Sequence, residues 1–441
     1  MSRPEPAANA APDTSLDTSL DADVVIVGAG IIGVCCALRL VQCDPQQRIL
    51  IIDRQSPGHG ASRGNAGHMA TEQVFPIADA SILRRLPAML LDPTGPLRLD
   101  WRYLPHLLPW WVRLLANLRA APFAASVAGL RALNEQSLAA WRRLLTSIGR
   151  GELLKENGSL LITESPDARE ALAPLRSRMA GQQVPVEFHD GVAVRRMAPQ
   201  LSAAISGGLF FPATGQCLDS LALVETLAAA AQRAGVRFEQ AEVTAGRVAA
   251  QGVVLDTLGG WRLRAGRVLI ANGAHAAPLV GALTGVRIPL DTERGYHLML
   301  PREHGRLPFP VTSLERRFIM TPMESGLRLA GTVEFAGLRR PPNMQRAWQL
   351  HRLSHGLFES DLSAESASTW MGFRPSLPDS LPIIDSVRNG RVLLALGHHH
   401  LGLTQAAITA EMIARLAQAP RRPESGEALP SSTAYRLARF A

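Results

Sequence analysis

Three glycines near the start of the chain, Gly28, Gly30 and Gly33, have the spacing of a phosphate-binding turn. They follow the apolar run VVIV and precede a helical apolar run, and Asp53 ends the next apolar run. In a strand–turn–helix unit, such glycines permit the turn, admit a pyrophosphate and pack the helix against the strand. An acid at the position of Asp53 accepts hydrogen bonds from ribose hydroxyls. The pattern predicts dinucleotide binding, and a glycine-rich turn in a generic α/β domain is the alternative.

The elements that position these residues form a Rossmann-like unit, and the same order of strand, glycine turn and helix recurs near the C-terminus. There the apolar strand RVLLALG leads through a glycine turn into the helix TQAAITAEMIARLAQA. We therefore expect an α/β fold in which one nucleotide-binding domain is assembled from both chain ends, with a mixed β-sheet substrate domain inserted. The expected segments are a disordered tail at 1–20, the nucleotide-binding domain at 21–78, 201–285 and 363–441, a helical region at 79–150, and the substrate domain at 151–200 and 286–362.

Composition narrows the class of protein. The chain has 441 residues, 46% of them hydrophobic and 19% charged, which is enough for two folded domains. Its net charge is +8, but no arginine run is dense enough to indicate a nucleic-acid partner. The four cysteines lack metal-ligand spacing, so neither a metal site nor a disulfide framework is expected. The N-terminal residues lack an apolar signal-peptide core, and a cytoplasmic setting is predicted.

Five further motifs occur in a fixed order: SRGNAG at 62–67, GGLFFPATGQCLD at 207–219, ERGYHL at 293–298, GFRPSLPDSLPII at 372–384 and GHHHLGLTQA at 397–406. With GAGIIG and Asp53, they resemble the FAD-dependent amino-acid oxidoreductases of the D-amino-acid oxidase superfamily, most closely the bacterial D-amino-acid dehydrogenase branch. The resemblance spans almost the whole chain. It implies FAD, a Rossmann-like FAD-binding domain and a mixed sheet that covers the flavin.

Two segments favour FAD over NAD on their own residues. Gly397, Gly402 and Thr404 stand at a helix start, whose free amides suit the flavin edge that gains negative charge on reduction. An ordinary helix cap is the alternative there. The glycine loop at 62–67 can lie beside the isoalloxazine, and a surface loop is the alternative. The residues predicted to bind the cofactor are Gly28, Gly30, Ile31, Gly33, Asp53, Arg54, Ser62, Gly64, Asn65, Ala66, Gly67, Val243, Asn272, Gly273, Gly372, Gly397, His398, Leu401, Gly402, Leu403 and Thr404.

Attachment of the flavin is expected to be non-covalent. No cysteine follows Cys217, and the motif around His68 differs from those that carry a histidyl flavin in relatives. Lys155 is the only lysine and stands before a predicted strand, away from the expected flavin site. Some amine-oxidising relatives use a lysine to activate oxygen, so its absence favours a dehydrogenase that passes electrons to a quinone or another carrier.

Three residues are predicted to be catalytic. The resemblance implies that Arg374, in GFRP, binds the substrate carboxylate as a bidentate clamp, and a structural arginine is the alternative. Tyr296 is predicted to face the pocket while His297 points the other way along the strand, and a core tyrosine is the alternative. His399 replaces a glycine usual in the dehydrogenase branch, and it is predicted to narrow the pocket or accept the amine proton. His400 is expected at the surface or in packing.

These residues predict oxidation of a D-amino acid to a 2-oxo acid and ammonia, by hydride transfer from Cα to flavin N5. A secondary cyclic amine, such as D-proline or hydroxy-D-proline, is the first alternative substrate. A flavoprotein subunit of a heteromeric complex is the second alternative, and a non-catalytic nucleotide-binding protein is the third. Aromatic and arginine residues at 82–118 suit peripheral contact with the cytoplasmic face of the inner membrane, or packing on the FAD domain.

Overall fold

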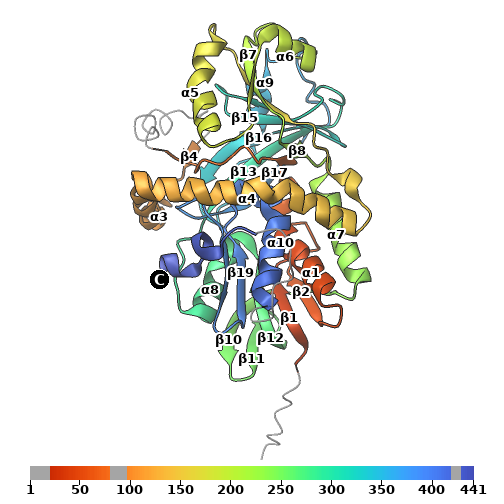
Figure 1. Cartoon of the computed structure of the whole chain (residues 1–441), viewed down its shortest axis with the longest axis vertical. Helices are drawn as coiled ribbons and strands as arrows, with labels where there is room; N and C mark the ends of the chain where they lie inside the picture. Colours follow the sequence, from red (N-terminus) through yellow and green to blue (C-terminus); the bar gives the residue numbers. More distant parts are fainter. Residues whose placement is uncertain (1–19, 80–96, 419–428) are drawn as a thin grey trace, which may run out of the picture.

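The computed structural model describes residues 20–79, 97–418 and 429–441. Two large sheets divide the protein, one in the lower half of Figure 1 and one in the upper half. The tail predicted at 1–20 lies outside the described residues except for Leu20, and so does the motif ILRRLPAMLL at 82–91.

The lower sheet has eight strands and contains the glycine motif. Its strands follow the order β10-β11-β12-β1-β2-β9, and β19 and β18 extend it from β12. β1 lies between β2 and β12 and runs parallel to both, as expected for a Rossmann-like unit. The strands are β1 (Ala22–Val27), β2 (Ile49–Asp53), β9 (Arg237–Gln240), β10 (Val243–Ala249), β11 (Gly252–Thr257), β12 (Arg262–Ile270), β18 (Ile383–Val387) and β19 (Val392–Leu396).

Helices cover both faces of this sheet. Val24 and Ile26 of β1 pack with α1, α7 and α10, whereas Val25 and Val27 pack with α8 on the other face. The helices are α1 (Ile31–Cys43), α7 (Ser220–Arg233), α8 (Ala277–Thr284) and α10 (Gly402–Gln418). α1 and α10 come from opposite ends of the chain and lie side by side (Figure 1). The domain is therefore assembled from both chain ends, as predicted.

The upper sheet has nine strands and is mostly antiparallel. Its order is β17-β13-β16-β15-β14-β5-β7-β6, and β4 pairs with β16. Leu298 and Leu300 of β13 pack with α9 and α6 on the outer face, so the other face is turned toward the FAD-binding domain. The elements are β4 (Leu97–Leu99), β5 (Ser159–Thr163), β6 (Glu187–Asp190), β7 (Gly207–Phe211), β13 (Asp291–Leu300), β14 (Val311–Ser313), β15 (Phe318–Met323), β16 (Gly326–Phe335), β17 (Ser368–Ser376), α5 (Ala168–Gly181), α6 (Gly191–Met197) and α9 (Gln345–Ser354).

Two strands of this sheet depart from the predicted segments. β7 pairs with β5 and β6, and β17 pairs with β13, so both belong to the upper sheet. The sequence places them in the FAD-binding segments 201–285 and 363–441. The local residue pattern specifies a strand but not its distant partners, which decide the sheet to which the strand belongs.

Helix α4 (Ala120–Ser147) lies across the junction between the two halves, next to the shorter helix α3 (Leu104–Asn117) (Figure 1). Trp141 of α4 is fully buried, and its indole Nε1 donates to the carbonyl oxygens of Leu403 and Thr404, at 3.0 and 3.1 Å. This contact ties α4 to the first turn of α10. The segment predicted as helical at 79–150 thus contains two helices within its described part.

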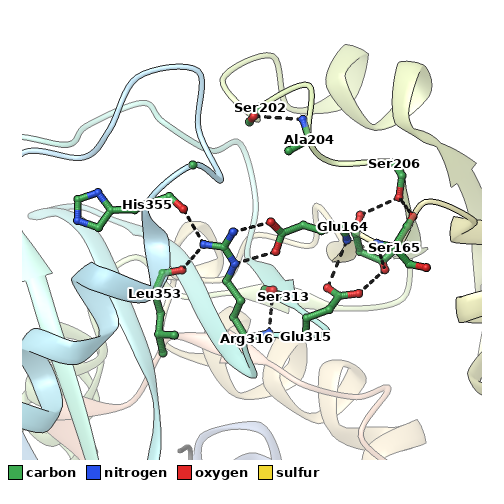
Figure 2. Close-up of polar contacts among 12 residues, drawn as sticks. Glu164, Ser165, Ser202, Ala204, Ser206, Ser313, Glu315, Arg316, Leu353 and His355 are labelled. Atoms are coloured by element: carbon green, nitrogen blue, oxygen red, sulfur yellow. Dashed lines mark hydrogen bonds and ion pairs between the residues drawn. The ribbon is translucent and has the colours of Figure 1, made fainter. Parts of the chain in front are cut away.

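A cluster of polar contacts joins β5, the turn between β14 and β15, and α9 in the upper half of the protein. Figure 2 shows Arg316, in the turn between β14 and β15, paired with Glu164 at the end of β5. The same guanidinium donates to the carbonyl oxygens of Leu353 and His355 at the end of α9, at 2.7 and 2.6 Å. One arginine therefore satisfies a helix C-terminus and joins three elements.

The remaining short elements frame the region between the sheets. They are β3 (His68–Met69) and β8 (Gly215–Gln216), which pair with each other, and the 3-10 turns η1 (Ala61–Gly64), η2 (Gly151–Leu153), η3 (Gly273–His275), η4 (His399–Leu401), η5 (Ser432–Tyr435) and η6 (Leu437–Phe440). Among the described residues, no helix combines the length and the apolar character needed to cross a membrane.

Candidate active site

A cavity of about 1020 Å³ extends from the glycine turn of the lower sheet to the inner face of the upper sheet. It is bordered by the residues that the sequence predicts for the cofactor and the substrate. The predicted residues that line it are Gly28, Gly30, Ile31, Asp53, Arg54, Ser62, Gly64, Asn65, Ala66, Val243, Asn272, Gly273, Tyr296, Gly372, Arg374, Gly397, His398, His399, Gly402 and Leu403.

The glycine turn accepts no side chain at two of its positions. Gly28 has φ +116°, and a Cβ there would lie 2.5 Å from the carbonyl oxygen of Ala271. A Cβ at Gly33 would lie 1.9 Å from the carbonyl oxygen of Gly28, because helix and strand are in close contact. Asp53 Oδ2 accepts from the amide of Ala29 at 2.8 Å and so fixes the turn. This is a cradle shaped for a pyrophosphate, and FAD fits its residues.

The loop at 62–67 is anchored to the FAD-binding domain. Ser62 Oγ accepts from the amide of Ile31 at 2.9 Å, at the start of α1, and Asn65 Oδ1 accepts from the amide of Gly67 at 2.9 Å. The guanidinium of Arg328, on β16, donates to the carbonyl oxygen of Asn65. The loop is therefore held between the two domains, and the surface-loop alternative is wrong.

Four residues predicted to bind the cofactor do not line the cavity: Gly33, Gly67, Leu401 and Thr404. Leu401 is buried in the apolar core, and Thr404 Oγ1 accepts from the amide of Ala70 at 2.9 Å. A Cβ at Gly67 would lie 2.5 Å from the carbonyl oxygen of Cys217, so this glycine serves close packing. Gly33 packs the helix against the strand, as its place in the motif predicts, whereas Gly67, Leu401 and Thr404 are directed away from the cavity and their predicted contact with the cofactor is corrected.

His68 has both ring nitrogens engaged. Nδ1 lies 3.3 Å from the carbonyl oxygen of Gly215, and Nε2 lies 3.0 Å from Glu72 Oε1. Neither nitrogen is left to form a bond to a flavin, which agrees with the expectation of non-covalent FAD.

Arg374 places a positive charge in the part of the cavity that adjoins the upper sheet. It lies on β17, and its guanidinium covers Gly295 of β13, where a Cβ would be 2.6 Å from Cζ. Burial lowers the pKa of Arg374 and the charge of Glu293 opposes this, but an arginine stays protonated in proteins. Among the described residues, no side chain or carbonyl group forms a hydrogen bond with the guanidinium. It is therefore free to bind an anion.

Glu293 is the acidic neighbour of Arg374 and was not predicted from the sequence. The two residues are directly paired across β13 and β17. Burial acts to raise the pKa of Glu293, but His399, a hydrogen bond of 2.6 Å from Ser376 Oγ and the charge of Arg374 together hold it at about 2. A permanent carboxylate thus lies beside the arginine in a buried position.

His399 does not have the predicted free nitrogen. Its backbone has φ +52°, in the region that favours glycine, which agrees with the glycine of the dehydrogenase branch at this position. Its Nε2 accepts from the amide of Leu377 at 3.0 Å, so the proton is on Nδ1, which lies 3.7 Å from Glu293 Oε1. His399 therefore cannot accept the amine proton, and this prediction is corrected.

Tyr296 borders the cavity and His297 does not, but the Tyr296 hydroxyl is engaged away from it. The Tyr296 hydroxyl donates to Glu334 Oε2 at 2.6 Å and accepts from the amide of Asn343 at 3.2 Å. Although Tyr296 borders the cavity, its hydroxyl lies on the face that α9 covers. His297 points toward the FAD side, where it stacks on the Trp370 ring with centroids 5.0 Å apart.

His400, expected at the surface or in packing, lines the cavity, and Gln73 and Trp370 line it without having been singled out from the sequence. The Trp370 ring lies against two glycines, and a Cβ at Gly64 or Gly372 would come within 2.1 or 1.9 Å of it. Trp370 therefore connects the upper sheet to the loop at 62–67. The only sequence signal for these residues is their closeness to the motifs at 62–67, 372–384 and 397–406.

The fold and the cavity define an oxidoreductase that uses FAD. A family model described as FAD dependent oxidoreductase matches residues 23–416. The chain is 32% identical to a D-amino-acid oxidase of Bradyrhizobium diazoefficiens over 400 residues, which is 89% of this chain and 94% of the relative. It is 28% identical to D-amino acid dehydrogenase 2 of Pseudomonas aeruginosa, over 91% of this chain and 96% of the relative.

Among solved structures, the glycine oxidase from Geobacillus kaustophilus shares the fold with a TM-score of 0.70 and 23% identity, over 95% of this chain and 98% of that chain. The protein belongs to the FAD dependent oxidoreductase family. FAD is its cofactor, and the predictions of fold class, family and cofactor are confirmed.

Proposed function

We propose that the protein oxidises D-amino acids to 2-oxo acids and ammonia. The observation that carries this proposal is the buried guanidinium of Arg374, which faces the cavity without a hydrogen-bond partner among the described residues. A carboxylate is the ligand that matches its planar fork, and two charge-assisted bonds would fix the α-carbon in place. The names of the relatives, D-amino-acid oxidase and D-amino acid dehydrogenase, support the substrate class.

FAD, when bound, supplies the acceptor for the hydride that leaves the α-carbon. The described residues of the chain bind and orient the substrate. Arg374 holds the carboxylate, and Glu293 beside it offers an acceptor to the ammonium group. Trp370 and the loop at 62–67 border the cavity where the two domains meet.

A secondary cyclic amine is the second candidate substrate. The solved L-proline dehydrogenase from P. horikoshii has the same fold, with a TM-score of 0.67 over 95% of this chain, but only 16% identity. Such a substrate presents the same carboxylate to Arg374, so the arginine does not distinguish the two. A subunit role in a heteromeric complex predicts instead that no amino acid reduces the isolated protein.

We propose that the electrons pass to a quinone or another carrier. Lys155, the only lysine in the chain, pairs through its backbone with Gln216 and does not line the cavity. The oxygen-activating lysine of some amine oxidases therefore has no counterpart here. α3 supports a membrane-bound acceptor, because it exposes Leu108, Val112 and Leu115 beside Arg113.

The test is anaerobic titration of the yellow protein with D-amino acids, L-amino acids and cyclic imino acids. D-amino acids should bleach the flavin band, and quinone should restore it faster than oxygen does. Arg374→Met should weaken substrate binding by about 100-fold or more, since two bonds to a charged group are lost. Arg352→Lys, on the exposed side of α9, is the matched control and should bind normally. A yellow protein that no amine bleaches would reject the proposal.

A further inference from the structure

His400 contributes the second imidazole of η4 to the cavity, and its hydrogen bond defines its tautomer. The ring Nε2 lies 2.6 Å from Gln73 Oε1. An amide oxygen only accepts, so the hydrogen must be on Nε2 and Nδ1 keeps its lone pair. Among the described residues, nothing forms a hydrogen bond with Nδ1.

Gln73 is itself held in place by the backbone around it. The backbone N–H of Gln73 donates to the carbonyl oxygen of Ala70 at 3.2 Å, and the backbone carbonyl oxygen of Gln73 accepts from Asn134 Nδ2 of α4 at 3.1 Å. Asn134 in turn accepts from Gln405 of α10 at 2.9 Å. The backbone of the residue that orients the imidazole is therefore held next to α4, and through Asn134 it is linked to α10.

The two neighbouring histidines lack a comparable group. His398 uses Nε2 in a 3.0 Å contact with Thr409 Oγ1 and is fully buried, and His399 accepts from Leu377. Of the three consecutive histidines, His400 alone combines partial exposure with a free lone pair at the cavity. It shares that cavity with Arg374 and Glu293.

We propose that His400, fixed in this tautomer by Gln73, accepts the proton of the substrate ammonium group at Nδ1. This inference rests on the proposed function. One N–H bond of the ammonium breaks and the Nδ1–H bond forms, which leaves a neutral amine and an imidazolium. The hydride then leaves Cα with its electron pair for FAD, so the substrate becomes a protonated imine. Water converts the imine to oxo acid and ammonium, and the imidazolium returns its proton to solvent as product leaves.

Several neighbouring groups act on the pKa of His400. Burial and the charges of Arg374 and His399 lower its pKa to about 4, while Glu293 and Glu72 act in the opposite direction. The ring is therefore neutral before substrate arrives. A substrate carboxylate on Arg374 would offset one of the charges that lower the pKa of His400, and this favours transfer of the ammonium proton to Nδ1.

The first test compares wild type with His400→Gln, because the glutamine amide can replace Nε2 in the bond to Gln73 but provides no base at the position of Nδ1. Flavin reduction by the best D-amino acid would be followed from pH 6 to 10. We expect a loss of about 100-fold at pH 7 that disappears toward high pH, where the amine deprotonates in solution. His351→Gln on α9 is the control, because that ring contacts Leu362 outside the cavity.

The second test needs no turnover. 2-Aminoisobutyrate has no Cα hydrogen and cannot be oxidised, and isobutyrate lacks the amine. His400→Gln should weaken binding of 2-aminoisobutyrate by about tenfold, because one hydrogen bond to a charged group is lost. Binding of isobutyrate should be unchanged. Gln73→Leu should also weaken binding of 2-aminoisobutyrate and not of isobutyrate, but by less than His400→Gln does. The ring stays in place, but without Gln73 its proton can be on either nitrogen.

Two results would overturn the inference: an equal rate loss at every pH, or equal weakening of both ligands. Either would mean that His400 only packs the cavity. A different result would reject the proposed function and not the role of His400. In that result no amine reduces the wild-type flavin, yet 2-aminoisobutyrate still binds wild type more tightly than His400→Gln.

Discussion

At the scale of single residues, the orientation of Tyr296 separates a structural group from a substrate group. Its hydroxyl lies between Glu334 and the amide of Asn343, and Arg294 lies 3.6 Å from the same carboxylate oxygen. Burial and Glu334 raise the pKa of Tyr296. A tyrosine with both its donor and its acceptor occupied stabilises the sheet and is not available to a substrate carboxylate.

Tyr296→Phe therefore tests the orientation of this hydroxyl. The variant removes the hydroxyl that bonds Glu334 and the amide of Asn343, so urea denaturation should show an unfolding free energy lower by about 0.5–1.5 kcal/mol. The KM for the amino acid should stay within about twofold of wild type. A KM raised tenfold with unchanged stability would return Tyr296 to the substrate site.

The residue scale also shows where sequence reasoning succeeds. Arg374 and the glycines of the turn are found because a motif requires one residue type at each position. The alternation of side chains along a strand predicts that Tyr296 and His297 face opposite sides, but it does not predict on which side the cavity lies. The sequence assigns proton transfer to His399 and packing to His400, whereas only the fold shows that Leu377 and Gln73 engage different rings.

At the scale of elements, α3 is the described segment with the most unusual surface. Leu107 and Trp110 pack beneath it, whereas Leu108 and Val112, one turn apart, are 56% and 59% exposed. Arg113 is exposed between them and the helix end. An apolar face beside positive charge matches the interface of an anionic membrane.

We expect the protein to sediment with vesicles that contain anionic phospholipid, and less so with neutral vesicles or at high salt. The double variant Leu108→Asp, Val112→Asp should remain in the supernatant while flavin reduction is unchanged. Leu258→Asp, at a 71% exposed leucine after β11, is the control for a lost apolar side chain. Wild-type protein that stays in solution with every vesicle would contradict the membrane contact.

Most elements could be predicted from periodicity, but their assembly could not. The residue pattern at 345–359 predicts a helix, and the structure has α9 there, which ends at Ser354. The pattern at 158–165 predicts a strand, which is β5. The patterns of β7 and β17 predict strands, yet the sheet to which each belongs depends on distant partners. Paired residues are more than 40 positions apart for β7 and β5 and more than 65 positions apart for β17 and β13. Local patterns carry no information on such pairings.

At the scale of the whole molecule, the burial of histidines makes stability depend on pH. Burial lowers the pKa of His297 and His398 to about 3 and that of His400 to about 4, against about 6.5 for an exposed histidine. Below pH 6.5 the unfolded chain binds protons at these rings and the folded protein does not. The unfolding free energy therefore falls as pH decreases from about 6.5, until the folded rings protonate near pH 3–4.

Each buried histidine can contribute at most ~1.4 kcal/mol per pH unit in this window. Urea denaturation with FAD in excess, at pH 7 and pH 5, should show a lower unfolding free energy at pH 5. His398→Gln should reduce that difference, because the glutamine amide can still contact Thr409 but does not titrate. His304→Gln, at an exposed histidine, is the control and should leave the difference unchanged. If His304→Gln and His398→Gln altered the pH dependence equally, burial of His398 would not be its cause, and acid sensitivity would have to come from the carboxylates instead.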